Sequence, residues 1–132
     1  MIKKIFKKKK LIALIIFKKF TCKDIKFFTP ENSPQQIGYM NRPKDYVVKP
    51  HKHLKVSRNI RQVQEVLFIK KGKIQVELFC NKGIFISKHI LNTGDIIFLS
   101  SGCHGLKMLK QTEIIEVKQG PYNKKKDKIF ID

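Results

Sequence analysis

The stretch between residues 62 and 79 reads QVQEVLFIKKGKIQVELF. It contains two runs, residues 62–71 and 73–79, that are rich in Val, Ile, Leu and Phe and are separated by Lys71-Gly72-Lys73. Runs of β-branched and aromatic residues on either side of a glycine turn are typical of a β-hairpin. We therefore expect two antiparallel strands here.

The same pattern continues on both sides of this hairpin. Turn signals at Asn81-Lys82-Gly83 and Asn92-Thr93-Gly94-Asp95 separate further apolar runs. Strands are also predicted at residues 36–41, 45–49, 84–91, 95–100, 104–109 and 112–118. Prolines between residues 30 and 50 argue against long helices there. About eight short strands without intervening helices predict an all-β domain of mostly antiparallel strands, either a sandwich or a barrel.

The size and composition limit the remaining possibilities. The chain has 132 residues, of which 42% are hydrophobic, so it can build one domain with its own core. A basic start precedes the apolar residues 11–17, but this run lacks a small-x-small cleavage site, so we do not expect a signal peptide. Three cysteines at irregular positions are too few for a disulfide framework or a cysteine zinc site. They indicate reduced thiols in a cytoplasmic protein.

The formal net charge of +19 is concentrated towards the two ends of the sequence. Residues 1–28 hold ten Lys and one Asp, and residues 123–132 hold four Lys and two Asp. Only three of the 29 basic residues are Arg, which disfavours a nucleic-acid reader because Arg supplies the bidentate contacts to phosphate and guanine. We expect a basic N-terminal extension at residues 1–27, a β domain at residues 28–122 and a charged tail at residues 123–132.

Two interpretations of the N-terminal extension are open. It can be a helical or frayed segment that packs on the domain or on a partner subunit. It can also be a basic amphipathic segment, residues 1–20, that makes peripheral contact with a membrane surface.

Four residues form a candidate metal site. Glu65 shares a strand face with the apolar Val63 and Leu67, and a carboxylate on such a face is costly unless it is paired or bound to a metal. His104 lies on a similar face, and His51 and His53 point the same way in an extended segment. Three imidazoles and one carboxylate suit one divalent transition metal, either Fe, Mn, Ni, Co or Zn. The alternative is satisfied core histidines with a salt-bridged Glu65.

These residues resemble the motifs of the cupin superfamily. His51, His53, Glu65 and Gly72 resemble its first motif, G-x5-H-x-H-x3-4-E-x6-G, although eleven residues separate His53 from Glu65. The sequence from Gly94 through Gly102 to His104 resembles the second motif, G-x5-P-x-G-x2-H-x3-N. Here Ser100 stands in place of Pro, His104 comes one residue early and Met108 stands where Asn is usual.

The match is closer to a group of small single-domain cupins, from about Phe28 to Asp127. It is carried by residues 34–41, 64–69, 102–105 and 115–122. The resemblance implies a jelly-roll β-barrel with a metal inside, a homodimer and a carbohydrate-related role. It implies no particular reaction, because this barrel hosts isomerases, epimerases, dioxygenases, decarboxylases and plain binding proteins.

Several residues are candidates for contact with a substrate. Lys55, Arg58 and Arg61 lie in the long loop after the two histidines, where cations could hold a carboxylate or phosphate. Tyr46 and Glu116 are further candidates. The alternatives are a solvated loop for the three cations and a surface ion pair with Lys118 for Glu116.

The sequence favours a metal-binding cupin that binds or acts on a small polar or anionic metabolite such as a sugar derivative. If it is an enzyme, we expect a metal-dependent isomerase, epimerase or oxygenase. One alternative is a ligand-binding or sensing module without turnover. Another is a basic surface protein that contacts a membrane or nucleic acid through its Lys-rich tail. No glycine-rich phosphate loop and no Gly-x-Ser-x-Gly elbow is present.

Overall fold

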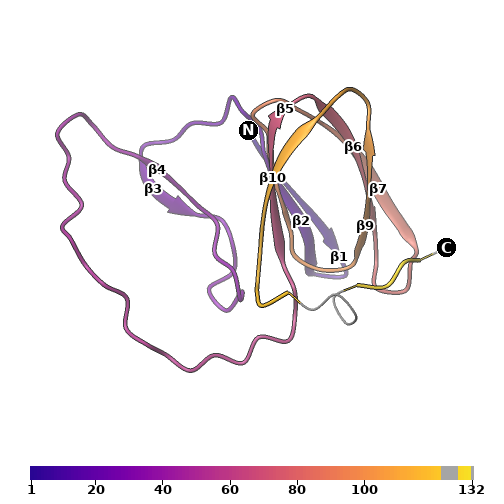
Figure 1. Ribbon diagram of the computed structural model, residues 1–132, viewed down its shortest axis with the longest axis horizontal. Helices are drawn as coiled ribbons and strands as arrows, with labels where there is room; N and C mark the ends of the chain where they lie inside the picture. The colour runs from indigo at the N-terminus through magenta and orange to yellow at the C-terminus, as the bar shows by residue number, and fades with distance from the viewer. Residues whose placement is uncertain (123–127, 132) are drawn as a thin grey trace. The chain divides into compact units, whose positions relative to one another are not determined.

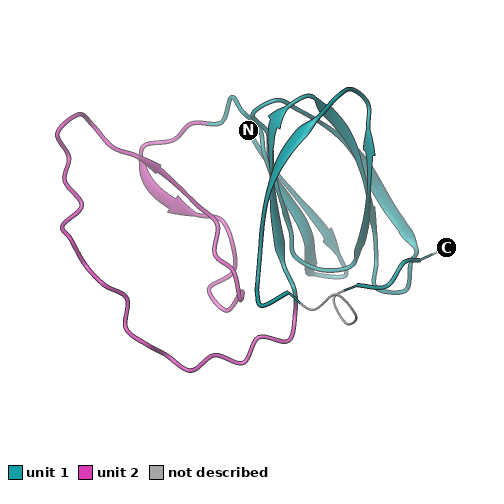
Figure 2. Cartoon of the chain, in the orientation of Figure 1, with its two compact units in different colours: residues 1–20, 63–132 teal, residues 21–62 magenta. Residues whose placement is uncertain are grey.

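The computed structural model describes residues 1–122 and 128–131, and the chain forms two compact units (Figure 2). The first unit comprises residues 1–20 and 63–132, and the second comprises residues 21–62. No helix in the described residues has the length and apolarity that crossing a bilayer requires.

The first unit contains two antiparallel sheets (Figure 1). The first is five-stranded and has the order β1 (Ile2–Lys7), β2 (Lys10–Ile16), β8 (Ile96–Leu99), β5 (Glu65–Lys71) and β10 (Glu113–Lys118). The second is three-stranded and has the order β7 (Phe85–Asn92), β6 (Lys73–Phe79) and β9 (Cys103–Met108). These strands confirm the predicted all-β, mostly antiparallel fold.

The core lies between these two sheets, and strict alternation on β6 shows how it is built. Ile74, Val76 and Leu78 are fully buried, whereas the residues between them are half-buried. Leu67 and Ile69 of β5 belong to the same buried cluster. Each such aliphatic side chain stabilises the fold by about 1.5–3 kcal/mol when it leaves water.

The helical alternative for the N-terminal extension is wrong. Residues 2–7 and 10–16 form the antiparallel strands β1 and β2, and β2 is an interior strand between β1 and β8. Every residue of Leu11–Ile16 is buried, as expected for a strand that is covered on both faces. The sequence does not predict this hairpin, because its two turn residues are Lys8 and Lys9 rather than the usual Asn-Gly. Their φ angles are 48° and 64°.

The second unit contains one short hairpin, β3 (Asp24–Phe27) with β4 (Gly38–Asn41). The connection is held by Gln36, whose Oε1 accepts a hydrogen bond from Thr29 Oγ1 at 2.6 Å. The strand predicted at residues 45–49 is wrong, because residues 42–62 form no strand. Pro43 and Pro50 flank that run and remove backbone donors from it. Of the predicted C-terminal tail, residues 123–127 and 132 lie outside the described residues.

Candidate functional site

The candidate site lies between the two sheets of the first unit, near their edge strands β9 and β10. Glu65 is the first residue of β5, and in the ladders it is opposite Leu99 of β8 and Lys118 of β10. His104 of β9 is opposite the fully buried Leu78 of β6, so its side chain points to the inner face of the second sheet. The two strands therefore present Glu65 and His104 towards the same interior.

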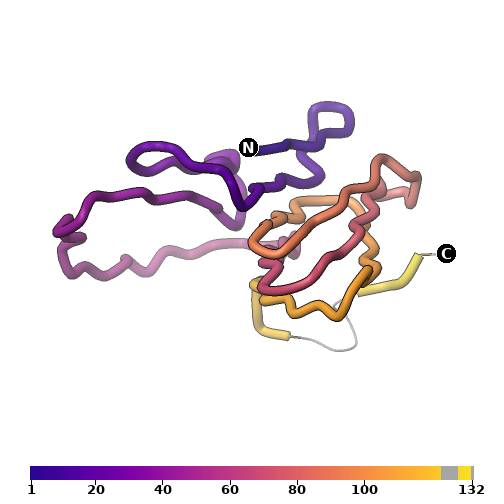
Figure 3. The backbone as a smooth tube through the Cα atoms, turned by 90° about the horizontal axis from the view of Figure 1, so that it is seen from above, coloured from indigo at the N-terminus to yellow at the C-terminus, as the bar shows by residue number. Residues whose placement is uncertain are grey.

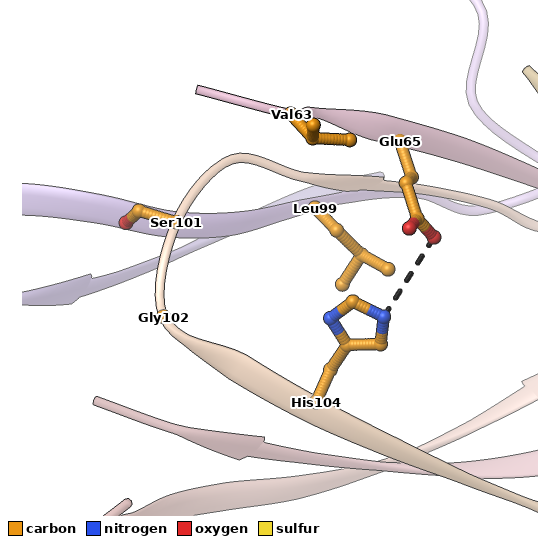
Figure 4. A pocket seen from close by; sticks show the side chains of 6 residues that line it. All are labelled: Val63, Glu65, Leu99, Ser101, Gly102 and His104. Carbon is orange, nitrogen blue, oxygen red and sulfur yellow. Dashed lines mark ion pairs between the residues drawn. The ribbon is translucent and has the colours of Figure 1, made fainter. Parts of the chain in front are cut away.

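Glu65 and His104 meet across this interior. The Oε2 atom of Glu65 lies 3.7 Å from Nε2 of His104, and the two side chains are 21% and 32% exposed. Figure 4 shows the side chains approaching from opposite strands, beside Leu99. They line a small cavity of about 30 Å³ together with Val63, Leu99, Ser101 and Gly102. A cavity of this size holds one water molecule or one metal ion.

The surroundings of His104 favour its neutral form. Burial lowers the pKa of its imidazole below the usual 6.5, and Lys128 lowers it further, whereas Glu116 acts in the opposite direction. Burial disfavours the charged form of an imidazole because the interior solvates charge poorly. Burial therefore favours the neutral imidazole in the contact with Glu65, and a neutral imidazole is the form that binds metals.

A larger cavity of about 800 Å³ adjoins the pair. Glu116 and Lys118 line it, and Lys118 Nζ lies 3.9 Å from Glu116 Oε1. Leu106 and Phe79 contribute apolar surface. Glu116 was predicted as a substrate-contact candidate, and it lies in this cavity. Sequence reasoning assigned Lys118 only as a surface partner of Glu116, although its position two residues further along β10 places it on the same face.

The two remaining metal candidates lie in the second unit. His51 and His53 are exposed, and their ring centroids are 5.3 Å apart. Nδ1 of His51 lies 2.8 Å from the carbonyl oxygen of Lys49. The structure thus brings the four candidates together in two pairs, one pair in each unit. Within the described residues, no group of three or more His, Cys, Asp or Glu side chains is arranged to hold a metal ion.

The other predicted substrate contacts also belong to the second unit. Lys55, Arg58 and Arg61 are exposed in the segment that follows His53. Tyr46 is 50% exposed, and the guanidinium of Arg42 lies 4.6 Å from the centroid of its ring.

Gln64, the residue directly before Glu65, supports the start of β5. Gln64 is 2% exposed, its backbone N–H donates to Gln119 Oε1 at 2.7 Å, and its Nε2 donates to Ser100 Oγ at 3.1 Å. These bonds tie the start of β5 to β8 and to the chain after β10. Gln64 alternates with Glu65 along the chain, and its hydrogen bonds fix the backbone beside that residue.

No protein-family model matches this sequence, and neither the curated proteins nor the solved structures contain a match to it.

Proposed function

We propose that this protein is a small cupin-type jelly-roll protein that binds one divalent transition metal. Glu65 and His104 are the ligands from the first unit, and His51 and His53 are the further ligands suggested by the sequence. The observation that carries the proposal is the approach of Glu65 Oε2 to His104 Nε2, at 3.7 Å, beside a cavity large enough for an ion.

The chemistry of these donors fits the proposed metal. A carboxylate oxygen and a neutral imidazole nitrogen suit Fe, Mn, Ni, Co and Zn. Such a metal, when bound, polarises a carbonyl group or holds a carboxylate or enediolate oxygen. Val63 and Leu99 line the small cavity with apolar surface beside the two donors.

The proposed ligand is a small polar or anionic molecule, such as a sugar derivative. The larger cavity, at about 800 Å³, falls within the usual range for small-molecule sites. Lys118 lies in it and offers an ammonium group to a carboxylate or phosphate, and Glu116 offers an acceptor to hydroxyl groups. An isomerase, epimerase or oxygenase activity is one use of such a site, and ligand sensing without turnover is the other.

Metal analysis of the purified full chain tests the proposal directly. We expect about one equivalent of a transition metal after loading, and a sharp loss of affinity in Glu65→Gln and in His104→Ala. His89→Ala is the matched control, because His89 lies on β7 and donates or accepts a hydrogen bond with Ser87 Oγ at 2.8 Å, away from the cavity residues. Less than about 0.2 equivalents of any metal after loading overturns the proposal.

The double variant His51→Ala/His53→Ala tests the second pair of ligands separately. The proposal expects a loss of metal affinity comparable to that in His104→Ala. Unchanged affinity in the double variant, together with loss in His104→Ala, removes the two histidines from the ligand set.

Turnover and binding are separated by one further comparison. Metal-loaded protein is incubated with a panel of sugar phosphates and keto acids, and both substrate consumption and the shift in melting temperature are measured. Consumption that Glu65→Gln abolishes supports an enzyme, whereas a shift without consumption supports a sensing module. We also propose a homodimer in the cytoplasm, in agreement with the three free cysteines, and light scattering of the full chain tests the dimer.

A further inference from the structure

Two lysine-bearing turns lie at the same end of the first unit. They are the β1–β2 turn at Lys8 and Lys9 and the β6–β7 turn around Lys82, and both views place them near each other (Figures 1 and 3). Backbone hydrogen bonds around Ile84 and Lys82 lower the pKa of the Cys80 thiol, and the charges of Lys7 and Lys82 lower it further. Lysines from the two hairpins therefore act on the same thiol, which agrees with the views.

This end of the unit concentrates positive charge. Lys7, Lys8, Lys9 and Lys10 are consecutive and exposed, and Lys82 is exposed on the neighbouring turn. Neither residues 1–23 nor residues 78–94 contain any Asp or Glu. The two hairpins thus supply cations without acidic side chains of their own to neutralise them.

The β1–β2 turn holds its lysines at a conformational cost. Lys8 and Lys9 have φ of 48° and 64°, in the left-handed region that costs free energy for residues other than Gly, Asn and Asp. Lysines along an edge strand such as β1 protect it against pairing with other chains, but the turn residues lie beyond the strand ladder. Edge protection therefore accounts for lysines such as Lys7 on β1 and leaves Lys8 and Lys9 unexplained.

Large apolar side chains accompany these lysines. Phe6 is 53% exposed near the end of β1, one residue before Lys7 and the first turn, and Ile84 and Phe85 are 58% and 52% exposed just after the second turn. Lysines beside exposed aromatic and aliphatic side chains match the two layers of a bilayer interface, in which anionic headgroups cover the start of the hydrocarbon region. Each lysine near an anionic surface adds about 1 kcal/mol of attraction.

We propose that residues 6–10 and 82–85, which we name the lysine tip, dock the protein on an anionic lipid bilayer. Charge complementarity identifies the headgroups, and the exposed Ile84 favours a bilayer over nucleic acid, because an aliphatic side chain cannot stack on a base. Phe6 and Phe85 fit the apolar side of the same bilayer interface. All the basic residues of the lysine tip are Lys, which also favours a bilayer, because proteins that read nucleic acid favour Arg. This proposal is independent of the metal site.

Vesicle flotation of the full chain tests the lysine tip. Vesicles of phosphatidylcholine with about 30% phosphatidylserine are compared with vesicles of phosphatidylcholine alone. We expect binding only to the anionic vesicles, and a steep decrease in binding as salt is raised from about 0.1 M to 0.5 M, because salt screens exposed charges.

The double variant Lys8→Asn/Lys9→Gly is designed to remain folded. It removes two positive charges and introduces Asn and Gly, which are the residues preferred in a turn with positive φ. We expect vesicle binding about 10- to 30-fold weaker than in the unmodified chain, from the loss of two lysines. Lys70→Asn/Lys110→Asn is the matched control, because it also removes two exposed lysines. Lys70 lies near the start of β6 and Lys110 just after the end of β9, whereas the lysine tip lies beyond the end of β6.

A second variant separates a bilayer from nucleic acid. We expect Phe6→Ser/Ile84→Ser to weaken binding to anionic vesicles while its dependence on salt is unchanged. Equal binding to both kinds of vesicle, or equal losses in the control and in Lys8→Asn/Lys9→Gly, overturns the proposal. Tight binding to an oligonucleotide also overturns the proposal if Lys8→Asn/Lys9→Gly abolishes that binding and Phe6→Ser/Ile84→Ser leaves it unchanged. The lysine tip would then bind nucleic acid.

Discussion

Gly102 controls the turn that leads from β8 into His104. Its φ is +79°, and a Cβ atom at this position would meet the carbonyl oxygen of Phe79. Gly102→Ala should therefore lower the free energy of unfolding by about 2–4 kcal/mol, through backbone strain and the clash together.

Urea titration of Gly102→Ala measures this loss, and Gly105→Ala is the internal control. Nothing lies within 4 Å of a Cβ atom added to Gly105, and its φ lies outside the left-handed region. We expect the control to change stability by less than about 0.5 kcal/mol. Similar losses in both variants would contradict the role assigned to Gly102.

His89 should make the stability of the fold depend on pH. Burial lowers the pKa of its imidazole below 6.5, and the charge of Lys3 lowers it further. The unfolded chain then takes up the proton at a higher pH than the folded chain does, so this residue destabilises the fold progressively as the pH falls below about 6.5.

Urea titrations of the unmodified chain and of His89→Gln between pH 7.5 and pH 5, from about one unit above to about 1.5 units below the usual imidazole pKa, test this effect. We expect the variant to lose less stability than the unmodified chain over that range. A steeper loss in the variant would mean that protonated His89 is stabilised in the folded state.

At the level of elements, the β1–β2 hairpin carries a turn that is not optimal for stability. Lys8→Asn/Lys9→Gly should raise the free energy of unfolding by about 1 kcal/mol, because it relieves two unfavourable backbone conformations. Thermal melts measure the change, with Lys70→Asn/Lys110→Asn as the control. A lower melting temperature in Lys8→Asn/Lys9→Gly would mean that the lysine side chains themselves stabilise the turn.

The strands were predictable from sequence where two signals agreed. The apolar run of β6 is preceded by a glycine turn and followed by Asn81-Lys82-Gly83, and its predicted and observed bounds are the same, Lys73–Phe79. β2 has the stronger apolar run, but a lysine turn precedes it, so its strand was missed. The predicted strand at residues 45–49 had apolar residues and no partner. A strand forms where a neighbouring strand can hydrogen-bond to its backbone N–H and C=O groups, and the sequence of one segment does not identify that neighbour.

At the level of the whole molecule, residues 1–20 are part of the fold. β2 pairs with β8 through Ala13–Ile16, and Ile12, Ala13 and Ile15 belong to the buried core cluster. Removal of residues 1–20 should therefore abolish cooperative unfolding, because it exposes β8 and opens the core.

Circular dichroism during a thermal melt checks the truncated chain against the full one. A truncated chain that melts cooperatively at the same temperature would show that residues 1–20 are an extension, as their composition alone suggested.

The sequence by itself determined the strand-rich class of the fold, the core-facing positions of Glu65 and His104, and the excess of Lys over Arg. These properties depend on local alternation, on turn residues and on counting. Only the tertiary structure decided that β2 is an interior strand, that Glu65 and His104 approach to 3.7 Å, and that Lys82 joins the N-terminal lysines at one end. The reason is that these features depend on which strands pair and which sheets face each other. Strand pairing is determined by the apolar surface that the whole first unit buries, which no single segment of the sequence specifies.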